Sequence, residues 1–307
     1  MESHRSRPHE RTSTMKHIAI AGASGYLGFK MTRLLLNSGN AVLALSSKRE
    51  RLNASFSHTE MFMHVNRCDF SALSSQPIDI LVNCSFPRSE EGKELASGLA
   101  YTYDLFTAAK ENGVKSVINI SSQSVYSQTR EQYADEKEPL NPTSGYALGK
   151  YSAELICNAL LADTPHAHIR LASLIGPEFD QRFINFFAKK IINGEPITAK
   201  GSDQIFGFLD IRDAADALVT MTLHEPTTWK DVYNLGPQCG GYAFDTIMSA
   251  IERTAKQRGY QVRATYDTDR PWHNSGLDSS RFFSDFAWTP SHDLRDSIEC
   301  IFNHYEE

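Results

Sequence analysis

Tyr146 and Lys150, four positions apart, predict acid–base chemistry. Side chains four residues apart lie on one face of a helix. The Lys150 ammonium group favours the phenolate form of Tyr146, whose pKa is ordinarily about 10, so the phenol can exchange a proton near neutral pH. Ser122 ends a predicted strand, at the edge where open α/β sheets bind ligands. Together these residues predict proton transfer at a carbonyl or alcohol oxygen that Ser122 holds.

The run GASGYLG contains three glycines, Gly22, Gly25 and Gly28, directly after the predicted strand His17–Ala21. It opens a predicted helix at Tyr26–Asn37, and this strand–turn–helix context is typical of dinucleotide-binding proteins. The glycines allow a tight turn, a close approach of the backbone to a pyrophosphate, and close helix–strand packing, while the helix N-terminus presents N–H groups to the phosphates. We expect nucleotide contacts from Gly22, Ser24, Gly25, Tyr26, Leu27 and Gly28.

The end of the second predicted strand should select between the two nicotinamide cofactors. A carboxylate there binds the ribose 2′-hydroxyl of NAD, whereas a basic residue accommodates the 2′-phosphate of NADP. The sequence has Ser46, Ser47, Lys48 and Arg49 in this place and no carboxylate before Glu50. This favours NADP over NAD, the alternative being that the two cations are solvated loop residues.

Short apolar runs alternate with helical patterns from Lys16 onward, which predicts parallel strands covered by helices on both faces. The predicted strands are His17–Ala21, Ala41–Leu45, Ile78–Cys84, Lys115–Ser121 and His168–Ser173, and a long helix is predicted at Ser144–Leu161. The fold class is therefore α/β, a Rossmann-type doubly wound parallel sheet. We expect a flexible extension at residues 1–14, the dinucleotide-binding domain at 15–175, and a smaller α/β substrate lobe at 176–307, with some chain returning to the main body.

Composition excludes several classes of protein. The 307 residues are 41% hydrophobic and 22% charged with a net charge of −6, which is ordinary for a globular protein and offers no basic surface for nucleic acid. No apolar run approaches the roughly 20 residues that span a membrane. Five scattered cysteines without CxxC spacing indicate a reducing, cytoplasmic location. His166 and His168 have no Cys or carboxylate partner at ligand spacing, so no metal site is predicted.

The motifs GxxGxxG, SSxxVY and YxxxK occur here in that order. In this respect the sequence resembles the extended short-chain dehydrogenases/reductases, the NAD-dependent epimerase/dehydratase family, over nearly the whole chain from Met15. Further matches are Asp69-Phe70, the NCS run at Asn83–Ser85, RLASLIGP at Arg170–Pro177, LDIRDAADAL at Leu209–Leu218, YNLG at Tyr233–Gly236 and the segment Ser280–Pro290.

The resemblance implies specific site residues. It implies a catalytic set of Ser122, Tyr146 and Lys150, in which Lys150 also holds the nicotinamide ribose. The S-x-x-V-Y spacing selects Ser122 rather than Ser121 or Ser124 as the catalytic serine. It adds cofactor contacts at Asp69, Phe70, Asn83, Cys84 and Ser85, and substrate contacts at Ser124, Tyr126, Phe206 and Arg270.

Two departures from the family pattern affect the expected reaction. Many nucleotide-sugar enzymes of the family carry an arginine where this sequence has Phe206, although a second diphosphate-binding arginine matches Arg270. Dehydratases usually carry an Asp–Glu pair where Gln123 and Ser124 stand, so 4,6-dehydration is not expected.

The sequence therefore predicts an NAD(P)-dependent oxidoreductase acting at a carbonyl or hydroxyl carbon of a nucleotide-linked sugar, as a keto-reductase or an epimerase. The alternatives are an enzyme for a non-sugar ketone and a catalytically silent dinucleotide-binding regulator. Family analogy suggests a homodimer built on a helix bundle, with neither nucleic acid nor membrane as a partner.

Overall fold

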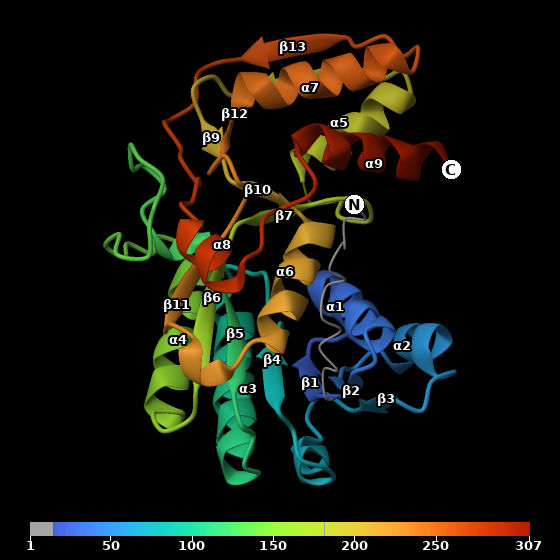
Figure 1. The fold of residues 1–307 in the computed structure, drawn as a ribbon. Helices are drawn as coiled ribbons and strands as arrows, with labels where there is room; N and C mark the ends of the chain where they lie inside the picture. Colours follow the sequence, from blue (N-terminus) through green and yellow to red (C-terminus); the bar gives the residue numbers. More distant parts are fainter. Residues whose placement is uncertain (1–14, 181) are drawn as a thin grey trace, which may run out of the picture.

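The computed structural model describes residues 15–180 and 182–307. It shows a body built around one large sheet and a smaller lobe above the sheet (Figure 1). The expected flexible extension at residues 1–14 lies outside the described residues.

Seven parallel strands form the central sheet, in the order β11-β6-β5-β4-β1-β2-β3. The strands are β1 (His17–Ala21), β2 (Ala41–Leu45), β3 (Phe62–Val65), β4 (Ile80–Asn83), β5 (Val117–Ser122), β6 (His166–Leu171) and β11 (Val232–Leu235). The inner strands are buried along almost their whole length, which is why they read as continuous apolar runs in the sequence. The predicted doubly wound α/β fold is confirmed.

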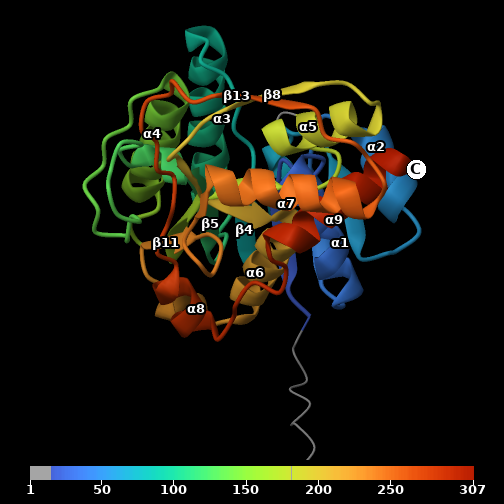
Figure 2. The same ribbon diagram turned by 90° about the horizontal axis from the view of Figure 1, so that it is seen from above.

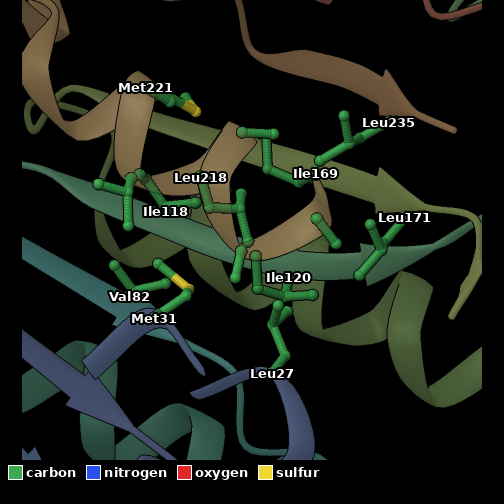
Figure 3. Close-up of a cluster of buried hydrophobic side chains, with 14 of the residues drawn as sticks. Leu27, Met31, Val82, Ile118, Ile120, Ile169, Leu171, Leu218, Met221 and Leu235 are labelled. Carbon is green, nitrogen blue, oxygen red and sulfur yellow. The ribbon is translucent and has the colours of Figure 1, made fainter. Parts of the chain in front are cut away.

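Helices cover both faces of this sheet. The body helices are α1 (Tyr26–Asn37), α2 (Arg49–Phe56), α3 (Gly92–Glu111), α4 (Gly145–Leu160), α6 (Ile211–Leu223) and α8 (Ser280–Phe286), with short 3-10 turns at Phe70–Ser74, Gln123–Val125 and Pro226–Thr228. On one face, Leu27 and Met31 of α1 and Leu218 of α6 pack on Ile118 and Ile120 of the sheet (Figure 3). On the other face, α3 and α4 pack together and bury a second apolar cluster.

The lobe has its own apolar core, built from three helices and short strands. Its elements are α5 (Phe183–Ile192), β8 (Ile197–Lys200), β9 (Ile205–Phe206), β12 (Tyr242–Ala243), α7 (Phe244–Gln257), β13 (Ala264–Asp267) and α9 (Leu294–Glu306). β8 pairs with β13 and β9 with β12. A further pair, β7 (Ser173–Ile175) with β10 (Phe208–Asp210), leads between body and lobe. Seen from above, α7 and α9 lie over the body (Figure 2).

The chain returns from the lobe to the body more than once. Helix α6 packs against α1, strand β11 forms an edge of the main sheet, and α8 packs against β11. All three elements come from residues beyond 175. In the described residues, no helix is long and apolar enough to cross a membrane.

Candidate active site

The turn after β1 has the tight backbone that the glycine motif predicts. Gly22 adopts φ +81°, and its N–H donates to the Leu45 carbonyl at 3.0 Å. A Cβ on Gly22 would lie 3.1 Å from the Cys84 carbonyl carbon, and a Cβ on Gly28 would lie 2.4 Å from the Gly22 oxygen. Only glycine fits both positions, because a side chain would collide with fixed backbone.

Helix α1 begins beside a large cavity and leaves its first N–H groups available. Gly25 is the N-cap, no side chain caps the helix, and no acidic residue stands in its first turn. Such a helix end attracts a phosphate. The cavity has a volume of about 830 Å³, within the range of small-molecule and cofactor sites. The predicted cofactor residues that line it are Gly22, Ser24, Gly25, Ser46, Ser47, Lys48, Cys84 and Ser85.

The end of β2 presents hydroxyls and a cation to this cavity. Buried Ser46 donates its hydroxyl to Ser24 Oγ at 2.6 Å and accepts the Lys48 N–H at 3.0 Å. Ser47 and Lys48 are exposed along the cavity wall. Arg49 begins α2 and is not among the lining residues, whereas Arg51, which sequence reasoning missed, donates to the Ser24 carbonyl at 3.2 Å.

Arg67 is a second cation that sequence reasoning missed. It lines the cavity, and its guanidinium carbon lies 4.4 Å from the centre of the Tyr101 ring. The expected adenine contacts, Asp69 and Phe70, are not lining residues: Phe70 packs beside Tyr101, and Asp69 accepts a hydrogen bond from the Ser71 hydroxyl. Arg67 lies two residues after the end of β3, and this position at a strand end could have marked it as a candidate.

Asn83 is a structural residue at the end of β4. It is buried, its side-chain oxygen accepts the Ser85 N–H, and its amide donates to Asn119 at 3.1 Å. It therefore shapes the turn that carries Cys84 and Ser85. Of the remaining motif residues, Leu27 belongs to the core, while the Tyr26 ring stacks on Phe179 with ring centres 4.7 Å apart.

The structure brings Ser122, Tyr146 and Lys150 together. Ser122 Oγ accepts hydrogen bonds from the N–H and the hydroxyl of Ser124, at 3.2 and 2.9 Å, which leaves the Ser122 hydrogen free to be donated. Tyr146 and Lys150 lie in the first turns of α4, and the Lys150 Nζ is 5.9 Å from the Tyr146 ring centre. Ser124, expected to contact substrate, instead orients Ser122.

Electrostatics around Tyr146 differ from the sequence expectation. Burial is the largest effect and leaves the pKa of Tyr146 above its ordinary value, although Arg88, the hydrogen bond with Ser122, and Arg182 all act to lower that pKa. The sequence predicted that Lys150 would lower the pKa of Tyr146. In the structure this role belongs to two distant segments, since Arg88 follows β4 and Arg182 is the N-cap of α5. No local motif marks either arginine.

Lys150 is buried between β5 and the segment after β4. Its Nζ donates to the Ile120 carbonyl at 2.7 Å and lies 5.1 Å from the centre of the Phe86 ring. Burial lowers the pKa of Lys150 to about 8, and burial raises the pKa of the neighbouring Cys84 thiol to about 12. Lys150 is therefore charged at neutral pH and loses its charge at about pH 8.

Tyr126 cannot contact a substrate directly, contrary to the sequence expectation. Its side chain is 0% exposed, it donates to Asn234 at 2.8 Å, and it accepts from Arg170 at 3.0 Å. Arg170 also makes two hydrogen bonds to the buried carboxylate of Glu154 on α4. Tyr126 belongs to a polar network inside the body, which four separate segments assemble.

Phe206 lies in an aromatic cluster of the lobe. Its ring stacks on Phe208 with centres 5.5 Å apart and packs edge-on against Phe183 at the same distance. Arg270 is exposed, and the described residues offer its side chain no hydrogen bond or ion pair. The structure therefore keeps Arg270 available at the surface while Phe206 packs among other aromatic rings.

His166 and His168 do have a cysteine neighbour in space. Ligand atoms of Cys157, His166 and His168 lie within 4.8 Å of one another, which the sequence expectation missed because Cys157 comes from α4. Both imidazole Nε2 atoms already bond the side-chain oxygen of Asn158, at 2.9 and 2.8 Å. Burial lowers the pKa of His168 to about 4, so His168 is neutral at physiological pH.

Helices α3 and α4 lie side by side and expose large apolar side chains. Leu148 and Leu155 of α4 are 52% and 49% exposed, and Tyr103 of α3 is 52% exposed. An exposed apolar surface of this kind often marks a contact with another protein chain.

Comparisons with known proteins show which family this chain resembles. The model of the NAD dependent epimerase/dehydratase family matches residues 18–236. A UDP-glucose 4-epimerase of Mycolicibacterium smegmatis is 25% identical, covering 91% of this chain and 95% of the relative. A dTDP-glucose 4,6-dehydratase of Streptomyces griseus is 23% identical, covering 92% of each. The structure of UDP-glucuronic acid 4-epimerase from Bacillus cereus with UDP-glucuronic acid and NAD has a TM-score of 0.81 at 22% identity, over 94% of this chain and 99% of that chain.

Proposed function

Because the chain belongs to the NAD-dependent epimerase/dehydratase family, we propose that it is an oxidoreductase acting on a nucleotide-linked sugar. The observation that carries this proposal is the convergence of Ser122, Tyr146 and Lys150 next to Phe86, which lines the cavity at the glycine turn. The names of the relatives supply the substrate class, since they include a UDP-sugar epimerase and a dTDP-sugar dehydratase.

The residues around the cavity fit a nicotinamide dinucleotide. The glycine cradle at Gly22 and Gly28 has no room for side chains, and the uncapped start of α1 suits a pyrophosphate. When bound, the cofactor supplies hydride transfer to and from a substrate carbon.

The chain's own residues then perform the proton chemistry. Ser122 donates its hydroxyl hydrogen to the reacting oxygen of the substrate and holds it in place. Tyr146 Oη takes the proton from a substrate hydroxyl during oxidation and returns a proton during reduction. The cations Arg88 and Arg182 favour the phenolate, and Lys150 offers its ammonium group to ribose hydroxyls.

For the cofactor we favour NADP over NAD. The hydroxyls of Ser24 and Ser46 and the ammonium group of Lys48 suit a phosphate, and no carboxylate stands at the end of β2. Arg51 and Arg67 add positive charge nearby. This preference supports net reduction of a keto sugar, which consumes NADPH. Epimerisation is the alternative reaction, in which the hydride taken from the substrate is returned to it.

The structure bears on two alternatives, dehydration of the sugar and reaction with a non-sugar ketone. Dehydration is disfavoured, because Gln123 is a buried amide and Ser124 is bonded to Ser122, so neither provides an acid. A non-sugar ketone is the second candidate substrate, since Phe206 places an aromatic ring where a diphosphate-binding arginine is usual.

The nucleotide that copurifies with the protein, identified by mass spectrometry, tests the reaction type. Tightly held NAD would indicate an epimerase, whereas an empty protein that binds NADPH would indicate a reductase. Incubation of the keto forms of UDP-sugars and dTDP-sugars with reduced, deuterated cofactor then tests the substrate class. Absence of deuterium in every nucleotide sugar, with transfer to a simple ketone, would refute the nucleotide-sugar proposal.

We further propose that α3 and α4 form a homodimer interface and that the protein is cytoplasmic. The exposed Leu148, Leu155 and Tyr103 support the interface, and the scattered free cysteines support a reducing compartment.

A further inference from the structure

Arg88 and Arg182 approach one aromatic ring from two different segments. Their guanidinium carbons lie 5.0 and 5.4 Å from the centre of the Phe179 ring, which itself stacks on Tyr26. The first arginine is exposed in the segment between β4 and α3, and the second is half-buried at the start of α5. The structure therefore holds two like charges close together above the glycine turn.

No carboxylate among the described residues neutralises this pair. Arg182 Nε donates to the Leu174 carbonyl, and neither arginine forms an ion pair within residues 15–180 and 182–307. The two acids nearest in sequence to Phe179 are engaged elsewhere: Glu178 lies 3.5 Å from Arg51, and Asp180 lies 2.8 Å from Lys189. Burial and the neighbouring Arg88 lower the pKa of Arg182 to about 10, so Arg182 stays charged at neutral pH.

These two positive charges lie near the reaction centre, where the Glu90 carboxylate accepts the Tyr146 N–H at 3.3 Å. Both guanidinium groups favour ionisation of the Tyr146 phenol, and Phe86, two residues before Arg88, packs edge-on against the Tyr146 ring. Two planar guanidinium groups match the geometry of a carboxylate, and each charged hydrogen bond is stronger than a neutral one. Like charges held together in a partly buried site favour binding of an anion there.

We propose that Arg88 and Arg182 bind a carboxylate carried by the substrate sugar, beside the carbon at which Tyr146 acts. The inference rests on the proposed function and narrows its substrate class to acidic nucleotide sugars. The diphosphate of the cofactor is the other anion that could approach this pair, because Tyr26 starts α1.

Calorimetric titration of the cofactor-loaded enzyme with UDP-glucuronic acid and UDP-glucose tests the proposal, since these probes differ in one carboxylate. We expect UDP-glucuronic acid to bind at least tenfold more tightly. Arg182→Gln should abolish most of this ratio, and so should Arg88→Gln, which changes an exposed residue outside the apolar cores. Lys190→Gln, on the outer part of α5, removes the same charge and should leave the ratio unchanged.

Each other outcome overturns part of the reasoning. Equal affinities for the two sugars in the parent enzyme would refute the carboxylate site and leave the proposed function standing. Failure of both sugars to bind would refute the nucleotide-sugar proposal and this inference together. Loss of NADPH affinity in Arg182→Gln, with the sugar ratio intact, would assign the pair to the cofactor diphosphate.

Discussion

The ion pair between Glu154 and Arg170 should be the most costly polar contact in the body to break. The side chains are 3% and 7% exposed, with Arg170 Nη2 2.8 Å from Glu154 Oε2 and Nε 3.1 Å from Oε1. Ser121 also donates its hydroxyl to Glu154. Glu154→Ala leaves the buried guanidinium without its partner, which typically costs about 3–5 kcal/mol of unfolding free energy.

Urea denaturation, followed by circular dichroism and tryptophan fluorescence together, measures this loss and tests for a single transition. The matched control is Glu299→Ala, which breaks an exposed pair with Arg295 of 2.8 Å and should cost about 0.5 kcal/mol or less. Glu154→Leu combined with Arg170→Leu should recover part of the loss, since no buried charge then remains. A loss for Glu154→Ala no larger than that of the control would refute the reasoning.

Four further changes test the site and the interface. Tyr146→Phe should lower turnover by about 10²–10⁴-fold with NADPH affinity nearly intact, because the phenol moves the proton; undiminished turnover across pH 6–9 would exclude that role. Lys48→Ala should weaken NADPH binding by about tenfold or more and leave NADH binding unchanged, since only NADPH carries the 2′-phosphate. Equal losses of affinity for both cofactors in calorimetry would show that the loop after β2 does not bind the 2′-phosphate. The pKa of Lys150 is about 8, so its positive charge is present below pH 8 and lost above it. Cofactor affinity should therefore fall about tenfold between pH 7 and 9, and in Lys150→Met it should not depend on pH. An affinity that does not change with pH in the parent protein would contradict this. Leu155→Glu should convert dimers to monomers in sedimentation velocity, and an unchanged sedimentation coefficient would remove α4 from the interface.

Sequence patterns predicted the fold and the local parts of the site, because those parts depend on neighbouring residues. The glycine turn follows its strand directly, and the spacing of Tyr146 and Lys150 places both on one helix face. The cations Arg88 and Arg182 were missed because only the tertiary fold brings their segments together. Tyr126 was wrongly predicted to contact substrate for the same reason, since its partner Arg170 lies on another strand.

The return of the chain from the lobe limits how this protein can be divided. A fragment ending at residue 175 would lack α6 and β11, whose Leu218 and Leu235 fill the core on one face of the sheet (Figure 3). Such a fragment would expose the edge of β6 and the apolar side of α1, and unpaired strand edges promote aggregation. Exchanging the substrate lobe for another therefore requires several separate insertions into the body, and two consecutive domains cannot simply be fused at one linker.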